Sequence, residues 1–312
     1  MQKIISTIIP VYNEEKNIPL INSELLNVFS TLPYDYEIIF VNDGSKDNSQ
    51  QIINDFIKKN KKTKSIEFSR NFGKEMATTA GLNHCKGDCA ILIDADLQHP
   101  VEIIPKFIMD WEKGFDVVIG IRKSSKSDTF IKTFGSKLFY KIMSKISDTE
   151  IAPNSTDFRL IDRKVIDAFN QCTEKTRITR GLIAWLGFKR SFVEFEANER
   201  AHGKASYSTI KLIKLALSSF VAMSLFPLKI AGYLGIFITL LSGVIGVFIF
   251  IEDFLLKDPL NMGFSWPAML ALLNMFLIGI ILSCLGLIAL YIGSISREVS
   301  NRPMYVVRNK NI

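Results

Sequence analysis

The first 200 residues alternate short apolar runs of strand length with longer runs of helical period. β-Branched residues are frequent in the short runs, and apolar residues recur every three or four positions in the longer ones. The pattern predicts strands over Ile4–Ile9, Glu37–Val41, Ser65–Phe68, Cys89–Ile93 and Asp116–Ile119, and helices over Glu14–Phe29, Asp47–Lys59, Lys74–Cys85 and Val101–Lys113. Such alternation is typical of an α/β fold with a mostly parallel sheet covered by helices on both faces.

Two long uncharged runs occupy the last third of the chain. No charged residue occurs in 230–251, and none occurs between 259 and 296. A helix over the first run would be about 33 Å long, and the hydrocarbon core of a bilayer is about 30 Å thick. We therefore predict a transmembrane hairpin over 229–296, with spans at 230–251 and 267–295. In the preceding segment, 208–228, lysines alternate with apolar residues, which predicts an amphipathic helix at the membrane surface.

The charges around this hairpin predict its orientation. The connection 252–266 carries three acidic residues and one lysine, whereas six basic residues lie beside the outer ends: Lys211, Lys214, Lys229, Arg297, Arg302 and Arg308. By the positive-inside rule, both termini face the cytoplasm. The expected organisation is a cytoplasmic domain over 1–207, a multi-pass anchor in the cell (inner) membrane and a cytoplasmic tail over 297–312.

Composition agrees with a membrane protein and argues against a nucleic-acid partner, a disulfide framework and a zinc site. The chain is 48% hydrophobic and 22% charged, with a mean hydropathy of +0.20, which is high for a purely soluble enzyme. The net charge of +7 is a mild excess over a mixed surface, so a nucleic-acid partner is not expected. Four cysteines without a repeated spacing indicate neither a disulfide framework nor a zinc site.

The candidate chemistry lies after the fourth predicted strand. Asp94 and Asp96 are separated by one alanine, and Gln98 adds a further side-chain oxygen. In an extended segment these side chains leave the same face. Two carboxylates so close repel each other unless a cation neutralises them, and Mg²⁺ or Mn²⁺ is held by such oxygen ligands. The segment predicts a metal site.

Phosphate groups would have to be bound without the usual glycine-rich loops, because no dinucleotide fingerprint or P-loop occurs. A metal at Asp96 and scattered cations are the alternative. Among these cations, Lys74 is expected to be an ordinary surface charge, whereas Arg122 and Arg200 fit a surface charge and a phosphate ligand equally well.

An ordered set of segments closely resembles the polyprenyl-phosphate glycosyltransferases of the inverting glycosyltransferase family two. The group includes bactoprenol glucosyltransferases and dolichol-phosphate mannose synthase. The matching segments are Ile9–Glu14, Asn42–Ser45, Ser69–Glu75, Asp94–Pro100, Asp157–Leu160, Arg180–Leu182, Tyr291–Gly293 and Arg302–Pro303. The resemblance covers nearly the whole chain, including the predicted hairpin.

The resemblance implies a GT-A fold and a role for each matching residue. Pro10, Tyr12, Glu14 and Asp43 are expected around the nucleoside, Asp94, Asp96 and Gln98 around the metal and diphosphate, and Asp157 as the candidate catalytic aspartate. The implied reaction transfers a sugar from a nucleotide sugar, which the resemblance leads us to expect to be UDP-linked, to membrane polyprenyl phosphate with inversion. The product would be a lipid-linked sugar donor for modification of cell-envelope glycans.

The acceptor segment departs from the family pattern. The family usually has Arg-x-x-Gly-x-Ser-Lys-aromatic, and here Arg200, Gly203 and Tyr207 match while Ala205 and Ser206 replace Ser-Lys. Lysine stands at position 204 instead. We therefore name Arg200, Lys204 and Arg122 together as candidate ligands of the acceptor phosphate.

Two other functions are compatible with parts of the pattern. A non-catalytic membrane scaffold would need the hairpin but not the Asp-x-Asp-x-x-Gln segment. A processive polysaccharide synthase normally needs a wider bundle of spans around a translocation path, which two helices provide only in a homo-oligomer. Oligomerisation stays open at this point.

Overall fold

The computed structural model describes residues 2–123, 155–175, 177–198 and 266–312, together with the single positions 237, 244 and 251. The chain divides into two compact units. Met1–Ser208 and Asn301–Ile312 form the first unit, and Thr209–Ser300 form the second.

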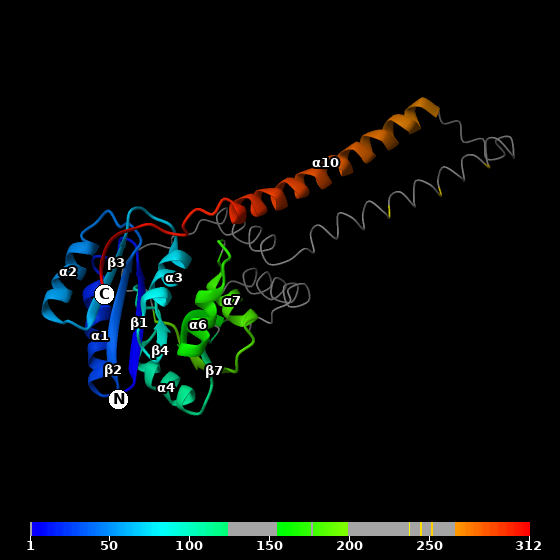
Figure 1. The fold of residues 1–312 in the computed structure, drawn as a ribbon. Coiled ribbons are helices and arrows are strands. Elements are labelled where there is room, and N and C mark those ends of the chain that lie inside the picture. Colours follow the sequence, from blue (N-terminus) through cyan, green and yellow to red (C-terminus); the bar gives the residue numbers. More distant parts are fainter. Residues whose placement is uncertain are drawn as a thin grey trace. The chain divides into compact units, whose positions relative to one another are not determined.

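The first unit is built on a mixed sheet that has eight strands in the described part of the chain (Figure 1). The strands lie in the order β7-β5-β6-β4-β1-β2-β3-β8. Their bounds are β1 Ile4–Val11, β2 Asp35–Asn42, β3 Thr63–Phe68, β4 Cys89–Leu92, β5 Val117–Arg122, β6 Ser155–Asp162, β7 Arg190–Phe195 and β8 Val307–Asn311. The central strands β3, β2, β1 and β4 are mutually parallel, whereas β6 and β8 pair antiparallel with their neighbours. The predicted α/β class with a mostly parallel sheet is confirmed.

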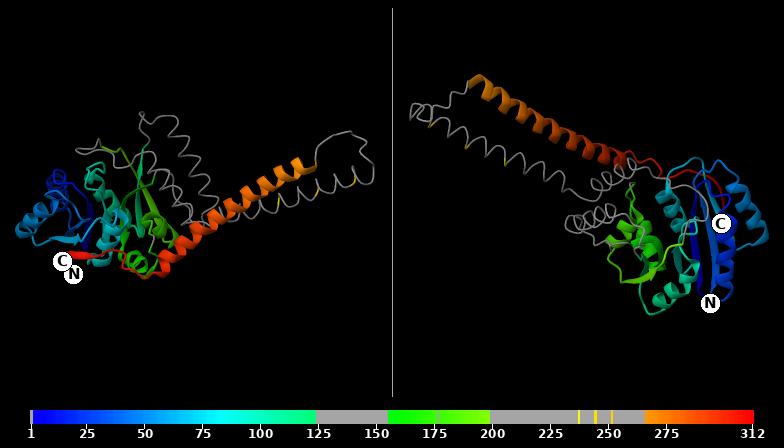
Figure 2. Two further views of the ribbon diagram at one scale, coloured as in Figure 1. Left: turned by 90° about the horizontal axis from the view of Figure 1, so that it is seen from above. Right: turned by 180° about the vertical axis from the view of Figure 1, so that it is seen from behind.

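Helices cover both faces of this sheet (Figure 2). Helices α1 (Ile18–Ser30), α2 (Ser49–Lys59) and α4 (Ile104–Glu112), the last preceded by the short turn η1 (Val101–Ile103), pack in one apolar cluster. Helices α3 (Lys74–His84), α6 (Arg163–Gln171) and α7 (Thr179–Trp185) pack in the other. The strand residues divide between the two clusters with period two, so that Ile5 and Ile9 join the first and Ile8 joins the second.

The elements predicted in residues 1–122 are confirmed, with shifts of a few residues at their ends. The largest shift is at the first helix, which begins at Ile18 rather than at Glu14. Residues 14–17 form a turn, closed by a hydrogen bond from the Asn17 amide to the Glu14 carbonyl at 2.9 Å. This turn belongs to the loops at the carboxyl end of the sheet, where ligands bind in open α/β folds.

Helix α3 lies very close to the central strand β1. A Cβ atom on Gly81 would come within 2.2 Å of Cγ2 of Ile8, which is fully buried. Only glycine therefore permits this approach. The close packing determines where the first residue of α3, Lys74, lies above the end of the sheet.

The second unit is represented by α10 (Trp266–Val299), a 34-residue helix. This helix includes the whole predicted span 267–295. Among the residues that the structure describes, no helix is both long and apolar enough to cross a membrane. The predicted span 230–251, apart from its three isolated described positions, and the predicted interfacial helix 208–228 lie outside the described residues.

The C-terminal residues add a strand to the sheet of the first unit. The sequence predicted no element there. Strand β8 pairs antiparallel with β3, from Ser65 opposite Asn311 to Phe68 opposite Val307. The Tyr305 ring stacks on Phe68 with centroids 4.9 Å apart, and its hydroxyl accepts a hydrogen bond from Asn83 Nδ2 at 3.0 Å. The strand was missed because it is a mostly exposed edge strand, so it carries no alternating apolar pattern.

We expect the Tyr305→Ala variant to lower the stability of the first unit by about 1–3 kcal/mol, since it removes an aromatic stack and apolar burial. Tyr305→Phe is the matched control, because it keeps the ring and loses only the hydroxyl, and should cost at most about 1 kcal/mol. Denaturant unfolding of the purified full chain measures both. Equal stability of Tyr305→Ala and wild type would show that the C-terminal segment does not support the sheet.

Candidate active site

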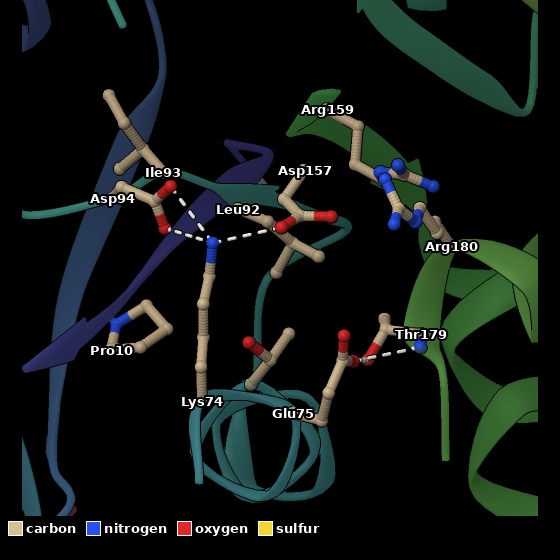
Figure 3. A pocket seen from close by; sticks show the side chains of 11 residues that line it. Pro10, Lys74, Glu75, Leu92, Ile93, Asp94, Asp157, Arg159, Thr179 and Arg180 are labelled. Carbon is tan, nitrogen blue, oxygen red and sulfur yellow. Dashed lines mark hydrogen bonds and ion pairs between the residues drawn. The ribbon is translucent and has the colours of Figure 1, made fainter. Parts of the chain in front are cut away.

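Two carboxylates from neighbouring strands meet at the edge of the sheet. Strands β4 and β6 pair antiparallel, with Leu92 opposite Arg159. Asp94 follows β4 by two residues, and Asp157 lies in β6 two residues before Arg159. Both carboxylates line a pocket (Figure 3). Ionised groups placed in this way need a cation between them.

Lys74, the first residue of α3, supplies that cation. Its Nζ lies 2.6 Å from Asp94 Oδ1 and 2.9 Å from Asp157 Oδ2, and Figure 3 shows it between the two side chains. Gly73, with φ at +102°, turns the chain into the helix at this point. The prediction that Lys74 is an ordinary surface charge is therefore wrong. Sequence alone did not show that α3 begins above the end of β4.

The ion pairs of Lys74 with the two carboxylates shift the pKa values of Lys74 and Asp157. Burial alone would raise the pKa of Asp157, but Lys74 and then Arg159 hold it well below its ordinary value. Burial alone would lower the pKa of Lys74, but Asp94 and Asp157 raise it well above its ordinary value. Both groups are therefore charged at neutral pH.

Arginines line the other side of Asp157. Arg159 on β6 is 2% exposed, and Arg180 on α7 is half-buried. Figure 3 shows their guanidinium groups beside each other, on the side of Asp157 away from Lys74. Below them, Glu75 accepts hydrogen bonds from the Thr179 amide at 2.8 Å and from its hydroxyl at 2.5 Å. Glu75 thereby joins α3 to the start of α7.

The segment after β4 presents oxygen ligands in a regular pattern. Asp94, Asp96 and Gln98 are half-buried, and the residues between them, Ala95 and Leu97, are buried. Among the described residues, no group of three or more acidic, histidine or cysteine side chains is placed to hold a metal ion. Two carboxylates and an amide nevertheless fit a hard divalent cation, because Mg²⁺ commonly takes only one or two carboxylates and completes its shell with substrate phosphates and water.

The loops after β1 and β2 are joined by hydrogen bonds. The Asn13 amide donates to Ser45 Oγ at 2.9 Å, and the Lys46 amide donates to Asn13 Oδ1 at 2.8 Å. Asn13 has a φ of +57°, a conformation that asparagine tolerates better than most residues. The two loops therefore form one rigid rim beside the pocket.

Asp43 supports the loop that precedes Lys74. Its carboxylate accepts hydrogen bonds from the amides of Phe72 at 2.6 Å and Gly73 at 2.9 Å. Burial raises its pKa, although the two amides act in the opposite direction. Gly44 beside it has a φ of +68°, and a Cβ there would come within 2.4 Å of the Arg70 carbonyl carbon. Any larger residue would displace this loop and, with it, Lys74.

The structure brings together some of the predicted site residues. Pro10, Asp94 and Asp157 line one pocket. Tyr12, 43% exposed, and Glu14, which accepts a hydrogen bond from Asn17 Nδ2 at 2.6 Å, lie in the loop after β1. Asp43, Asp96, Gln98 and Arg122 are not among the lining residues of this pocket, and Arg122 is exposed at the end of β5. Arg200 and Lys204 lie outside the described residues.

The pocket also contains residues to which the sequence gave no role. Arg159 and Arg180 occur in segments that match the family, but their types alone do not distinguish a site from a surface. Glu75 ends a matching segment, and Thr179 directly precedes one, but neither is a type of residue that indicates a site by itself. Only the pairing of β6 with β4 and the contact between α3 and α7 bring these four residues together, and neither is visible as a sequence period.

Comparison with known proteins identifies the family. The model of the family described as "Glycosyl transferase family 2" matches residues 6–169. An uncharacterised glycosyltransferase of Synechocystis sp. is 40% identical over 305 residues, which are 97% of this chain and 94% of that protein. The chain belongs to glycosyl transferase family 2.

Other proteins similar to this family 2 chain have more specific names. The bactoprenol glucosyl transferase of Shigella phage SfII is 36% identical over 98% of each chain. Among solved structures, the glucosyl-3-phosphoglycerate synthase of Mycobacterium tuberculosis in complex with Mn²⁺, UDP-glucose and phosphoglyceric acid is 17% identical. The match has a TM-score of 0.48 and covers 70% of this chain and 78% of that one.

The Lys74 bridge makes a prediction about pH. Lys74→Met leaves two carboxylates without their cation and should lower the melting temperature at pH 7, by about 2–4 °C for each kcal/mol lost. The stabilisation from the lowered pKa of Asp157 is present above the unfolded pKa of about 4 and is lost as the pH falls through the lower folded pKa. The difference between variant and wild type should therefore narrow below about pH 4.

Thermal unfolding of the full chain between pH 3 and pH 8 measures this difference. Lys164→Met is the control, because it removes an exposed lysine that pairs with Asp116 at 2.6 Å and should change little. A loss of stability that is the same at pH 7 and pH 3 would contradict the charge pairing.

Proposed function

We propose that this family 2 protein transfers a sugar from a nucleotide sugar to a polyprenyl phosphate in the membrane, with inversion at the anomeric carbon. The observation that carries the proposal is the pair Asp94 and Asp157 facing each other across Lys74, in a chain similar over its whole length to bactoprenol glucosyl transferases. The product is a lipid-linked sugar for modification of cell-envelope glycans.

The donor binds along the segment after β4. Asp94, Asp96 and Gln98 would hold Mg²⁺ or Mn²⁺, which would stabilise the negative charge that develops on the departing diphosphate. The proposed neighbours of the nucleoside are Pro10, which lines the pocket, and Tyr12, Glu14 and Asp43, which lie in the loops that form the rim beside it. The hydrogen bonds between the loops after β1 and β2 keep that rim in place before the donor arrives.

The acceptor needs little help to become a nucleophile. A phosphomonoester has a second pKa of about 6, so it is largely ionised at neutral pH. Asp157 is a poor general base, since its pKa is held well below its ordinary value and the best base titrates near the working pH. We assign Asp157 an electrostatic and orienting role, in which it holds Lys74 and faces the anomeric carbon as positive charge develops there.

The membrane anchor completes the proposal and is supported by the sequence. The uncharged runs 230–251 and 267–295 would form a hairpin, with 208–228 at the membrane surface. The basic residues outside the hairpin favour a catalytic unit and termini in the cytoplasm. Arg200, Lys204 and Arg122 stay the sequence-based candidates for contact with the lipid phosphate. Arg200 and Lys204 come just before the proposed helix at the membrane surface, where lipid headgroups lie.

We expect activity to require Mg²⁺ or Mn²⁺, and we expect Asp96→Asn to reduce turnover about 100-fold or more, the scale of losing one electrostatic stabiliser. Transfer of radiolabelled glucose from UDP-glucose to undecaprenyl phosphate measures this. The control is Asp167→Asn, an exposed carboxylate on α6. Full activity of Asp96→Asn, or of wild type in excess chelator, would contradict the metal assignment.

The proposed topology can be tested by cysteine labelling. A cysteine that replaces Asn261, in the connection between the two spans, should react with an impermeant thiol reagent applied to intact cells. A cysteine that replaces Asn309 should react only after the cells are opened, and the protein with its native cysteines alone gives the background. The reverse labelling pattern would overturn the orientation.

A further inference from the structure

Two arginines lie beside Asp157, and one of them, Arg159, has a donor that the described residues do not fill. Arg159 is almost fully buried, and its Nη2 donates to the Thr156 carbonyl at 2.6 Å. In the described part of the chain its buried Nε has no hydrogen-bond partner. An unsatisfied buried donor of a charged group is destabilising, because the hydrogen bond that it made to water is not replaced. Such a group, placed in the wall of a pocket, indicates a ligand that completes its hydrogen bonds.

The charge in the pocket is divided unevenly. Lys74 is bonded to both Asp94 and Asp157, and Glu75 is bonded to Thr179. Arg159 and Arg180 lie side by side beyond Asp157 (Figure 3), and each lowers the pKa of that carboxyl. Asp157 already pairs with Lys74, and Glu75, whose charge also acts on Arg159, makes its hydrogen bonds to Thr179, so neither carboxylate fills the donors of the two arginines. The arginine side of the pocket therefore attracts an anion.

We propose that Arg159 and Arg180 form the subsite for the phosphate of the acceptor. This inference rests on the proposed function and adds two ligands to the sequence-based candidates. Arg180 contacts the phosphate oxygens, and Arg159, which lines the same pocket, lies beside it as a buried cation whose Nε has no partner among the described residues. Guanidinium groups suit this task because their fork of donors matches a phosphate bidentately.

The position of the pair favours the acceptor over the donor diphosphate. The proposed site of the donor diphosphate begins at Asp94, and Figure 3 shows Lys74 and Asp157 between Asp94 and the arginines. In an inverting displacement the nucleophile and the leaving group lie on opposite sides of the reacting carbon. A phosphate held by Arg159 and Arg180 is therefore on the side from which the nucleophile must come.

The test separates the two phosphate sources. With the full-length protein, UDP-glucose and undecaprenyl phosphate, Arg180→Ala should raise the KM for the lipid phosphate about 10-fold or more, as expected for loss of a charged hydrogen bond. The affinity for UDP, measured by calorimetry with Mn²⁺ and without acceptor, should stay within about 2-fold. Arg180→Lys, which keeps the charge and loses the bidentate fork, should fall between wild type and Arg180→Ala.

Two further measurements keep the outcomes distinct. Lys164→Ala, an exposed residue on α6, should leave both constants unchanged, and thermal unfolding shows whether Arg180→Ala is folded. An unchanged KM for undecaprenyl phosphate in Arg180→Ala, or a parallel loss of UDP affinity, would overturn the acceptor subsite. If the wild type transfers no glucose to undecaprenyl phosphate but does transfer it to a soluble acceptor, the proposed function itself fails.

Discussion

The salt bridge from Lys74 to Asp94 and Asp157 is the interaction on which the rest of the site depends. The antiparallel pairing of β4 with β6 brings the two carboxylates together, and their repulsion requires a cation. That cation comes from the first residue of α3, so every feature that places α3 also places the charge. Gly81 lets the helix approach β1, and Asp43 holds the loop that leads into it.

This arrangement explains why residues far apart in the sequence act together. Asp43 follows β2, yet its hydrogen bonds reach the backbone of Phe72 and Gly73 immediately before Lys74. Glu75, the next residue of α3, is bonded to the start of α7, which carries Arg180. One short segment, residues 72–75, thus links the rim, the two carboxylates and the arginine pair, and a displacement of this segment would disturb all three.

The sequence predicted the central sheet well because its strands are buried on both faces and helices α1, α2 and α4 are amphipathic. It did not predict β8, whose exposed edge position leaves no apolar period. It found Asp94 because a carboxylate directly after a buried strand is informative by itself, whereas Asp157 came only from the resemblance to family two. It misjudged Lys74 and gave Arg159 and Arg180 no role, because a cation acquires meaning only from the carboxylates that it faces. The register between β4 and β6, with Leu92 opposite Arg159, depends on the tertiary structure and leaves no pattern in the sequence.

The charge balance of the pocket also indicates how the two proposed substrates would depend on each other. In the free protein three cations, Lys74, Arg159 and Arg180, face three carboxylates, Glu75, Asp94 and Asp157, so the pocket is close to neutral. A divalent cation at Asp94 would give the pocket a net positive charge. It would also replace Lys74 as the partner of Asp94 and leave Lys74 paired with Asp157. The two negative charges of a donor diphosphate would offset those of the metal, so a bound donor would leave Arg159 and Arg180 available to the phosphate of the acceptor.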